Sequence, residues 1–309
     1  MTFEGIHHIT AITADAQDNI DFYAGVLGLR LVKKTVNQDD PSVYHLFFAD
    51  EDGSAGSDLT FFEFPGSPRG LAGDGMVHEI AWRVASEEAL DFWADRLAGR
   101  DTETKRGKGT LVLADPEGLG HVLRVSDVAD EPLIADHPEV PAELALRGFD
   151  GVRAFSSAPE ASEGLLTELG FESASVRGTE HAWEARGGSR GGTIAYDTPP
   201  EERGLQGAGT VHHVAWASTP GEHEAWRERV IAGGAQPTQV IDRFYFRSIY
   251  FREPSGVLFE IATLGPGFTV DEPLESLGEK LSLPPDYEHL REQVEARLTP
   301  VRSPRQVPA

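Results

Sequence analysis

The feature that most constrains this chain is an internal repeat. Residues 75–82, GMVHEIAW, align without a gap on residues 209–216, GTVHHVAW. Each stretch is followed by an acidic segment whose apolar residues have helical spacing. Each then closes on a turn and a strand, DPEGLGHVLRV from Asp115 and EPSGVLFEIAT from Glu253. Such self-similarity indicates that one structural unit occurs more than once.

Two weaker copies of the unit begin at Gly5 (GIHHITAIT) and at Gly148 (GFDGVRAFS). In both, a glycine, Gly28 or Gly170, stands where a helix is expected to end. Each of the four copies therefore reads as a strand, a helix and several strands. One such half-sheet cannot bury its apolar face alone, so the units must pair. Four units give two pairs, which predicts an α+β fold.

Two proline-rich segments bound the repeats. SDVADEPLIADHPEVPAEL separates the second copy from the third, and LGPGFTVDEPLESLGEKLSLPPDYEHL follows the fourth. We expect a domain of two modules at 1–130, a linker at 131–147, and a second domain of two modules at 148–265. The remaining residues, 266–309, are expected to form an extended tail with a short helix in REQVEARL.

The composition argues against several classes of function. The 309 residues include no cysteine, so disulfides, zinc–thiolate sites and thiol nucleophiles are excluded, and a metal would need His, Asp or Glu ligands. A net charge of -24 disfavours nucleic acid and anionic membranes as partners. No apolar run approaches the roughly 20 residues that span a bilayer, and no signal segment is apparent. We therefore expect a cytoplasmic protein.

Four of the eleven histidines stand in two matching pairs, at 7–8 and at 212–213. Neighbouring side chains of a strand point to opposite faces. One member of each pair is therefore expected to face the concave side, and the other to face away or lie in a second layer. Alignment of the repeats places His8 and His213 where the other two copies carry Gly or Glu.

A carboxylate interrupts the closing strand of the last copy. Alignment of the closing turns brings Val122 opposite Glu260. A buried carboxylate needs a partner or a metal, because an unpaired buried charge is costly. His8, His213 and Glu260 on adjacent strands match the two-histidine, one-carboxylate triad that leaves open positions on a non-haem Fe(II).

These residues resemble the vicinal oxygen chelate superfamily, in which βαβββ modules pair into curved mixed-sheet half-barrels. Within it, the chain is most similar to ring-cleaving hydroquinone dioxygenases, over residues 1–265, through IHHIT, VHHVAW and PSGVLFEIAT in that order. The resemblance implies Fe(II), with Mn(II) as the alternative, held by His8, His213 and Glu260. It also implies a small aromatic diol and dioxygen as substrates, and a homo-oligomer.

The resemblance further implies a set of catalytic residues around the metal. They are His7, Thr10, His212, Arg243 and Tyr250. The last two lie in IDRFYFRSIYF, where Tyr245 and Arg247 are competing choices. His45, in VYHLFF, could also reach the cavity.

Two other functions remain open at this point. The first is a glyoxalase-like isomerase or lyase, which as a family pattern adds a fourth ligand, a carboxylate from the other closing strand. Alignment of Gly56 with Gly256 puts Thr60 at that place and turns Glu63 to the opposite side, which favours three ligands. The second is a metal-free protein that sequesters an aromatic drug. The complete triad argues against it.

Overall fold

The computed structural model describes residues 1–304, which contain two eight-stranded sheets. The four repeats each form a strand, a helix and three further strands. The first module consists of β1 (Ile6–Thr13), α1 (Ala16–Ile20) continued by the π-helix η1 (Asp21–Val26), β2 (Arg30–Asn37), β3 (Asp40–Ala49) and β4 (Asp58–Glu63). The second consists of β5 (Val77–Val84), α2 (Glu87–Ala98), β6 (Thr104–Gly107), β7 (Thr110–Ala114) and β8 (Gly120–Val125).

The third and fourth modules repeat this order. The third consists of β9 (Phe149–Phe155), the 3₁₀ turn η3 (Pro159–Ser162), α3 (Glu163–Glu168), β10 (Glu172–Ser173), β11 (Ala182–Arg186) and β12 (Gly191–Asp197). The fourth consists of β13 (Val211–Ser218), α4 (His223–Ala232), β14 (Ile241–Asp242), β15 (Arg247–Arg252) and β16 (Leu258–Thr263).

The segments outside the modules are mostly irregular. The segment between the second and third modules holds one short turn, η2 (Ala142–Leu144). The tail holds η4 (Phe268–Val270), η5 (Leu274–Ser276), η6 (Pro285–Leu290) and α5 (Arg291–Glu295). The helix α5 lies in the segment REQVEARL, and residues 305–309 of the predicted tail lie outside the described residues. The division into domains on either side of 131–147 stays a prediction.

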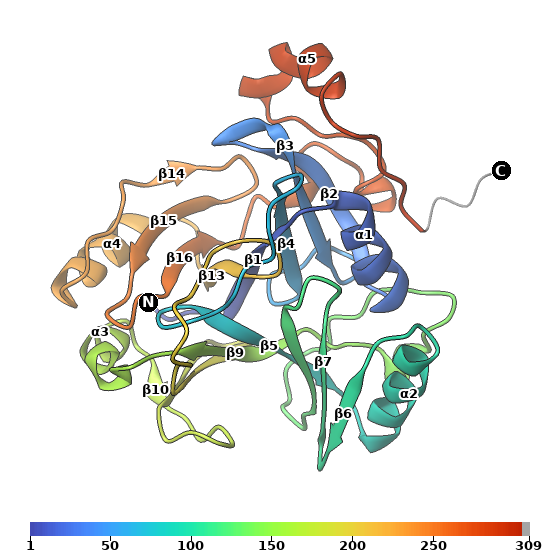
Figure 1. Cartoon of the computed structure of the whole chain (residues 1–309). Helices are drawn as coiled ribbons and strands as arrows, with labels where there is room; N and C mark the ends of the chain where they lie inside the picture. The colour runs from blue at the N-terminus through green and yellow to red at the C-terminus, as the bar shows by residue number, and fades with distance from the viewer. Residues whose placement is uncertain (305–309) are drawn as a thin grey trace.

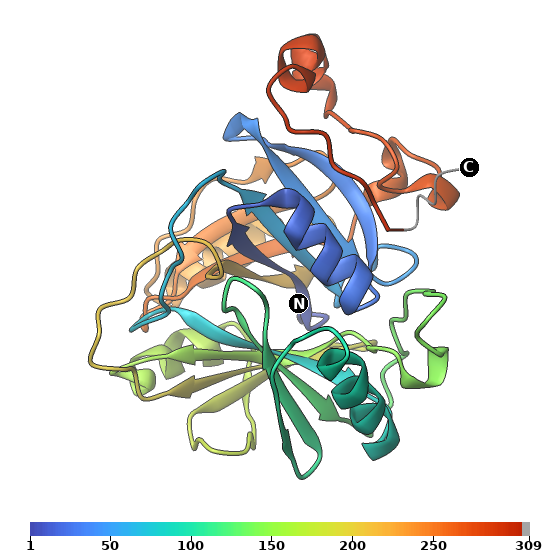
Figure 2. The ribbon, with the colours of Figure 1, turned by 45° about the vertical axis from the view of Figure 1, so that its right-hand side comes forward.

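Each sheet combines modules that are far apart in the sequence. One sheet, in the order β14-β15-β16-β13-β1-β4-β3-β2, joins the fourth module to the first. The other, β10-β11-β12-β9-β5-β8-β7-β6, joins the third to the second. Figure 1 labels most of these strands, and Figure 2 shows the first module, in blue, and the fourth, in orange, together in one body and the green middle of the chain in another. The predicted α+β fold of paired βαβββ modules is confirmed.

The helices follow from amphipathic patterns with caps. In α2, the Ser86 side chain accepts a hydrogen bond from the backbone N–H of Ala89 and so begins the helix. Leu90, Trp93 and Leu97, at helical spacing, are fully buried in the core. This helix packs on β6, β7 and β8 and covers the apolar face of its own module.

A β-bulge marks the first strand of every module. In the antiparallel β1–β13 pair, His7 is the extra residue on one strand and His212 on the other. In the β5–β9 pair the extra residues are His78 and Asp150. A bulge breaks the alternation of side chains, so the rings of His7 and His8 do not turn to opposite faces. Their Nδ1 atoms lie 2.9 Å apart, and strict alternation is therefore wrong at these pairs.

The tail is fastened to the first module by a buried lysine. Lys33 in β2 is fully buried, and its Nζ lies 2.7 Å from Asp271 Oδ1 and also pairs with Glu272. The same ammonium donates to the carbonyl of Phe268. Tyr245 donates its hydroxyl to Asp271 Oδ2 over 3.0 Å, so this cluster joins the tail to the fourth module as well.

Candidate metal centre

His8, His213 and Glu260 meet at the centre of the first sheet. They come from the adjacent strands β1, β13 and β16, with His213 paired to Thr10 and Glu260 paired to Ala215. Glu260 Oε2 lies 3.2 Å from His8 Nε2 and 2.9 Å from His213 Nε2. The two Nε2 atoms are 3.3 Å apart, and all three side chains are buried. Three ligand atoms from residues far apart in the sequence therefore point at one place.

The unsatisfied oxygen of Glu260 fits a cation at this place. Glu260 is fully buried, and its Oε1 accepts a hydrogen bond from Ser248. Its Oε2, despite the nearby imidazoles, forms no hydrogen bond of acceptable geometry. A buried anionic oxygen without a partner is costly, and a metal ion removes that cost. Two imidazole nitrogens and one carboxylate oxygen are a donor set used by Fe(II) and related divalent ions.

The protonation states also suit metal binding. Burial would raise the pKa of Glu260, but the neighbouring imidazoles of His8 and His213 outweigh it and hold that pKa well below its ordinary value. Burial lowers the pKa of His213, and the nearby negative charge of Glu260 offsets this only in part. A carboxylate beside neutral imidazole is the form that coordinates a metal without first losing protons.

A hydrogen-bond chain fixes the tautomer of His8. The Nε2 of His7 lies 3.1 Å from the carbonyl oxygen of Thr263, which can only accept, so His7 Nε2 carries the proton. Burial, with the nearby His8, lowers the pKa of His7 to about 3, so this ring is neutral and its Nδ1 accepts. His8 Nδ1 must then donate to it, which leaves the lone pair of His8 Nε2 facing the site.

The second histidine pair repeats this contact. The Nδ1 atoms of His212 and His213 lie 2.8 Å apart, and burial together with His213 lowers the pKa of His212 to about 4. His212 differs from His7 in being exposed at its outer edge, where its ring packs against Phe62. Both predicted residues therefore support a ligand from behind, and neither lines the cavity described below.

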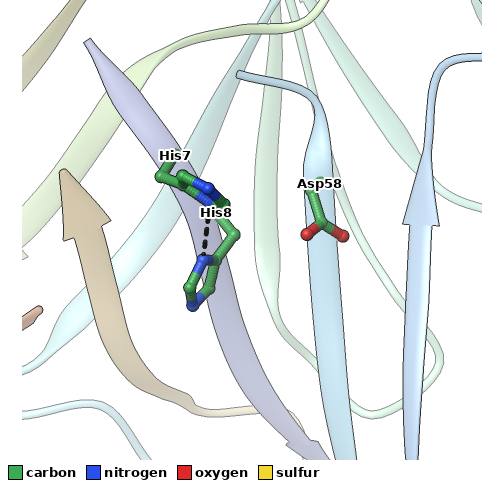
Figure 3. A group of neighbouring side chains, drawn as sticks. All are labelled: His7, His8 and Asp58. Carbon is green, nitrogen blue, oxygen red and sulfur yellow. Dashed lines mark hydrogen bonds between the residues drawn. The ribbon is translucent and has the colours of Figure 1, made fainter. Parts of the chain in front are cut away.

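A buried aspartate beside His8 was missed from the sequence. Asp58 begins β4 and is the parallel partner of His8, and Figure 3 shows its carboxylate beside the His7–His8 pair. A ligand atom of each of these three residues lies within 4.8 Å of the others. Neither oxygen of Asp58 has a hydrogen-bond partner among the described residues, and burial raises its pKa well above the ordinary value. The only sequence signal is a charge at the head of an apolar strand, GSDLTFF.

A cavity opens onto the metal site between the first and fourth modules. The empty space in and around it, including its solvent-filled mouth, amounts to about 440 Å³. Among the predicted residues, it is lined by His8, Thr10, His213, Arg243 and Tyr250. Of the two competing choices, Tyr245 also lines the cavity, whereas the Arg247 side chain is 65% exposed and lies elsewhere.

An ion pair between the first and fourth modules forms part of the cavity wall. Arg243 donates to both oxygens of Asp39, over 3.2 and 3.1 Å, and its guanidinium lies 5.5 Å from the ring centre of Tyr250. Burial raises the pKa of Tyr250, as does Glu260, so its phenol keeps its proton at neutral pH. Arg243 and Tyr250 thus place a cation and a hydroxyl beside the ligands.

The place of a fourth ligand holds threonine. Thr60 pairs with Thr10 in the parallel β1–β4 register, as Glu260 pairs with Ala215 in β13–β16. Glu63, three residues later, accepts a hydrogen bond from the backbone N–H of Ala16 at the start of α1. The Glu63 carboxylate therefore binds the start of α1. This agrees with the prediction from the alignment that Glu63 turns to the opposite side from Thr60.

The second sheet does not carry ligand residues at the corresponding positions. Its register puts Val122 and Ala195 at the two positions equivalent to Glu260. Glu79, which stands at the repeat place of His213, lies 3.9 Å from the Nε atom of Arg153. Within residues 1–304, the three-ligand centre of β1, β13 and β16 therefore has no counterpart in the other sheet.

Comparison with known proteins agrees with this architecture. The family model described as "Glyoxalase/Bleomycin resistance protein/Dioxygenase superfamily" matches residues 5–120 and 150–261. The chain is 40% identical to "Putative ring-cleaving dioxygenase MhqA" of Bacillus subtilis, over 98% of this chain and all of that protein. It is 31% identical to "Chlorohydroquinone/hydroquinone 1,2-dioxygenase" of Sphingobium indicum, over 94% of each. A crystal structure of a putative dioxygenase from Bacillus subtilis superposes with a TM-score of 0.91, at 40% identity and 98% coverage of both chains.

Proposed function

Since the chain belongs to the glyoxalase, bleomycin resistance protein and dioxygenase superfamily, we propose that it is an Fe(II)-dependent dioxygenase that opens the ring of hydroquinone-type diols. The observation that carries this proposal is the convergence of His8, His213 and Glu260, with an unsatisfied carboxylate oxygen, at the end of a cavity. The name of the Bacillus subtilis relative supports ring cleavage, and the name of the Sphingobium indicum relative supports hydroquinones as the substrate class. Mn(II) is the alternative metal.

His8, His213 and Glu260 would hold the metal. When bound, such an ion supplies Lewis acidity toward a phenolic oxygen and the one-electron chemistry that dioxygen requires. The protein's own groups do the remaining work. Arg243 stabilises negative charge that develops on the ring oxygens, and the protonated Tyr250 donates a hydrogen bond into the same region.

Residues behind the ligands hold their geometry. Through its Nδ1 atom, His7 fixes the tautomer of His8 and keeps the Nε2 lone pair of that ligand available, and His212 makes the same Nδ1 contact with His213. Thr10 lies beside the ligands on β1 and presents its hydroxyl to Thr60, not to a ligand. We assign His7 and His212 as positioning residues and Thr10, Arg243 and Tyr250 as residues that face the substrate.

The number of ligands favours oxygenation over a glyoxalase-like reaction. With Thr60 at the fourth place, three protein ligands leave room for both an aromatic hydroxyl and dioxygen. A closed four-ligand site would leave less room. A metal-free binding protein would have no use for a buried carboxylate with an unsatisfied oxygen. Among residues 1–304, no helix is long and apolar enough to cross a bilayer. A cytoplasmic location and a homo-oligomer stay predictions.

Oxygen consumption tests the proposal. Protein purified anaerobically and loaded with Fe(II) is mixed with hydroquinones, catechols or the methylglyoxal–glutathione adduct, and dissolved oxygen is recorded. We expect uptake with hydroquinones. Uptake with catechols alone would show that the substrates are catechols and not hydroquinones. Isomerisation of the adduct without oxygen would contradict the oxygenase proposal.

A further inference from the structure

The cavity wall opposite the fourth module carries a histidine that the proposed mechanism does not use. His45 lies in β3, lines the cavity and is held between the rings of Phe47 and Phe62, whose centres are 4.0 and 4.4 Å from its own. It is partly exposed, unlike the buried residues on either side of it in the strand. Both phenyl rings pack against the imidazole, which contributes to the wall of the cavity.

A chain of hydroxyls anchors one nitrogen of this ring. His45 Nε2 lies 2.9 Å from Thr60 Oγ1, which lies 2.8 Å from Thr10 Oγ1. A threonine hydroxyl donates once and accepts as well, so Thr60 joins the imidazole to Thr10 in either direction. Thr60 stands at the repeat place of Glu260, and His45 stands at that of Ser248, which donates to Glu260. At these two positions the first module therefore has a histidine–threonine hydrogen bond, where the fourth module has a serine–carboxylate hydrogen bond.

The other nitrogen of His45 remains available. No residue within 1–304 forms a hydrogen bond with its Nδ1. Three other polar groups of the wall are already engaged: Tyr245 donates to Asp271, Arg243 holds Asp39, and Gln38 donates to the carbonyl of Arg243. Thr35 also belongs to the wall, and its hydroxyl oxygen has no partner within residues 1–304, but that atom is itself buried. A para-diol presents its two hydroxyls at opposite ends of the ring. If one end lies at the ligands, the other needs a polar partner on the cavity wall wherever the wall shields it from water, or that hydroxyl loses a hydrogen bond.

We propose that His45 is a specificity-determining residue, whose Nδ1 hydrogen-bonds the hydroxyl of the aromatic diol that lies away from His8, His213 and Glu260. This rests on the diol substrate of the proposed function. Thr60 acts as a positioning residue, because it fixes the orientation of the imidazole. A hydroxyl both donates and accepts, so the contact forms with either neutral tautomer. Burial and the nearby His8 lower the pKa of His45 well below its ordinary value, so the ring is neutral at physiological pH.

The test compares the binding of two ligands that differ by this hydroxyl. Dissociation constants for hydroquinone and for phenol are measured by calorimetry on the metal-loaded protein without oxygen, so that no turnover occurs. We expect the wild-type protein to prefer hydroquinone, and His45→Phe, which keeps an aromatic ring between Phe47 and Phe62, to reduce that preference by roughly tenfold. Thr60→Val, which keeps the histidine but frees its ring, should reduce it less.

The matched control is His181→Phe, the same change at an exposed histidine of the second sheet, which should leave the preference unchanged. If His45→Phe disturbs folding, Thr60→Val, nearly identical in shape, carries the test alone. Equal preference in the wild type and in a folded variant of His45 or Thr60 would overturn the inference, as would a wild type that does not distinguish the two ligands. The predicted preference without any oxygen uptake would overturn the proposed function and leave the role of His45 standing.

Discussion

Thr60 of β4 and Glu260 of β16 occupy equivalent places in the two halves of one sheet. Thr60 pairs with Thr10 and Glu260 with Ala215, at the same position of the repeat. Both side chains are fully buried. Only one of the two carries a carboxylate, so the symmetry of the fold is broken at the position that decides how many protein ligands a metal receives.

Restoring that symmetry should close the site. In Thr60→Glu, a second carboxylate faces the ligands, and we expect the protein to retain metal but to lose oxygen uptake, because a fourth protein ligand fills a position that the reactants need. Metal content by elemental analysis and oxygen consumption are measured together. Thr60→Ser keeps the hydroxyl and serves as the control. A folded Thr60→Glu variant with normal oxygen uptake would exclude this place as a ligand position.

Replacing a ligand should weaken metal binding more than replacing a residue that supports a ligand. His7→Phe removes the acceptor for His8 Nδ1 and should weaken metal binding roughly 10- to 100-fold, whereas Glu260→Gln should weaken it further. Metal affinity is measured by competition with a chelator. His78→Ala is the matched control, because this histidine is the bulge residue of the second sheet and pairs with Asp197 instead. Equal losses in all three variants would mean that the site lies elsewhere.

A buried histidine in the second module predicts an acid-sensitive fold. His121 Nδ1 accepts from the indole N–H of Trp82, and its Nε2 lies 3.0 Å from the hydroxyl of Tyr23, which itself donates to Asp115. The contact with Trp82 requires an unprotonated Nδ1 and therefore the neutral ring, whose Nε2–H then donates to the Tyr23 oxygen. Burial lowers its pKa from 6.5 to about 3, so below pH 6.5 the unfolded chain binds a proton that the folded chain does not. The contribution of His121 to the free energy of unfolding should therefore be present in full above pH 6.5. It should be lost progressively as the pH decreases from 6.5 toward 3.

Urea unfolding near neutral pH and at about pH 5 measures this effect, with up to about 1.4 kcal/mol per pH unit from one such group. His121→Gln keeps a donor and an acceptor but does not titrate. It should be less stable at neutral pH and lose less stability on acidification. An unchanged slope would show that His121 does not contribute to the acid sensitivity.

Lys33, which is buried beneath the tail, should contribute more to the free energy of unfolding than a lysine on the surface does. Lys33→Met leaves Asp271 and Glu272 without their buried partner, and we expect a loss of about 3 kcal/mol in the free energy of unfolding. Lys34→Met, the next residue, is the control, because Lys34 forms only a long contact with the carbonyl of Glu279. Denaturant midpoints compare the two. A similar small loss in both variants would contradict a stabilising role for the buried ion pair.

The repeats explain why much of the fold, and the convergence of His8, His213 and Glu260, could be predicted. Module boundaries follow from aligned strands and helix ends, and Glu260 stands out because its counterpart is Val122. The bulges at His7 and His212 could not be predicted, since a bulge depends on the register of two strands that lie two hundred residues apart. Lys33 reads as an ordinary polar strand residue, because its partners lie in a tail without periodic pattern.

The most direct test of the proposed ring-cleaving activity is to follow the oxygen atoms into the product. Fe(II)-loaded protein is given hydroquinone under ¹⁸O₂, and the product is analysed by mass spectrometry, with Glu260→Gln as the inactive control. We predict an open-chain product that carries both atoms of one oxygen molecule, formed only by the protein with Glu260 intact. A product that retains the ring, or that contains no labelled oxygen, would contradict the account.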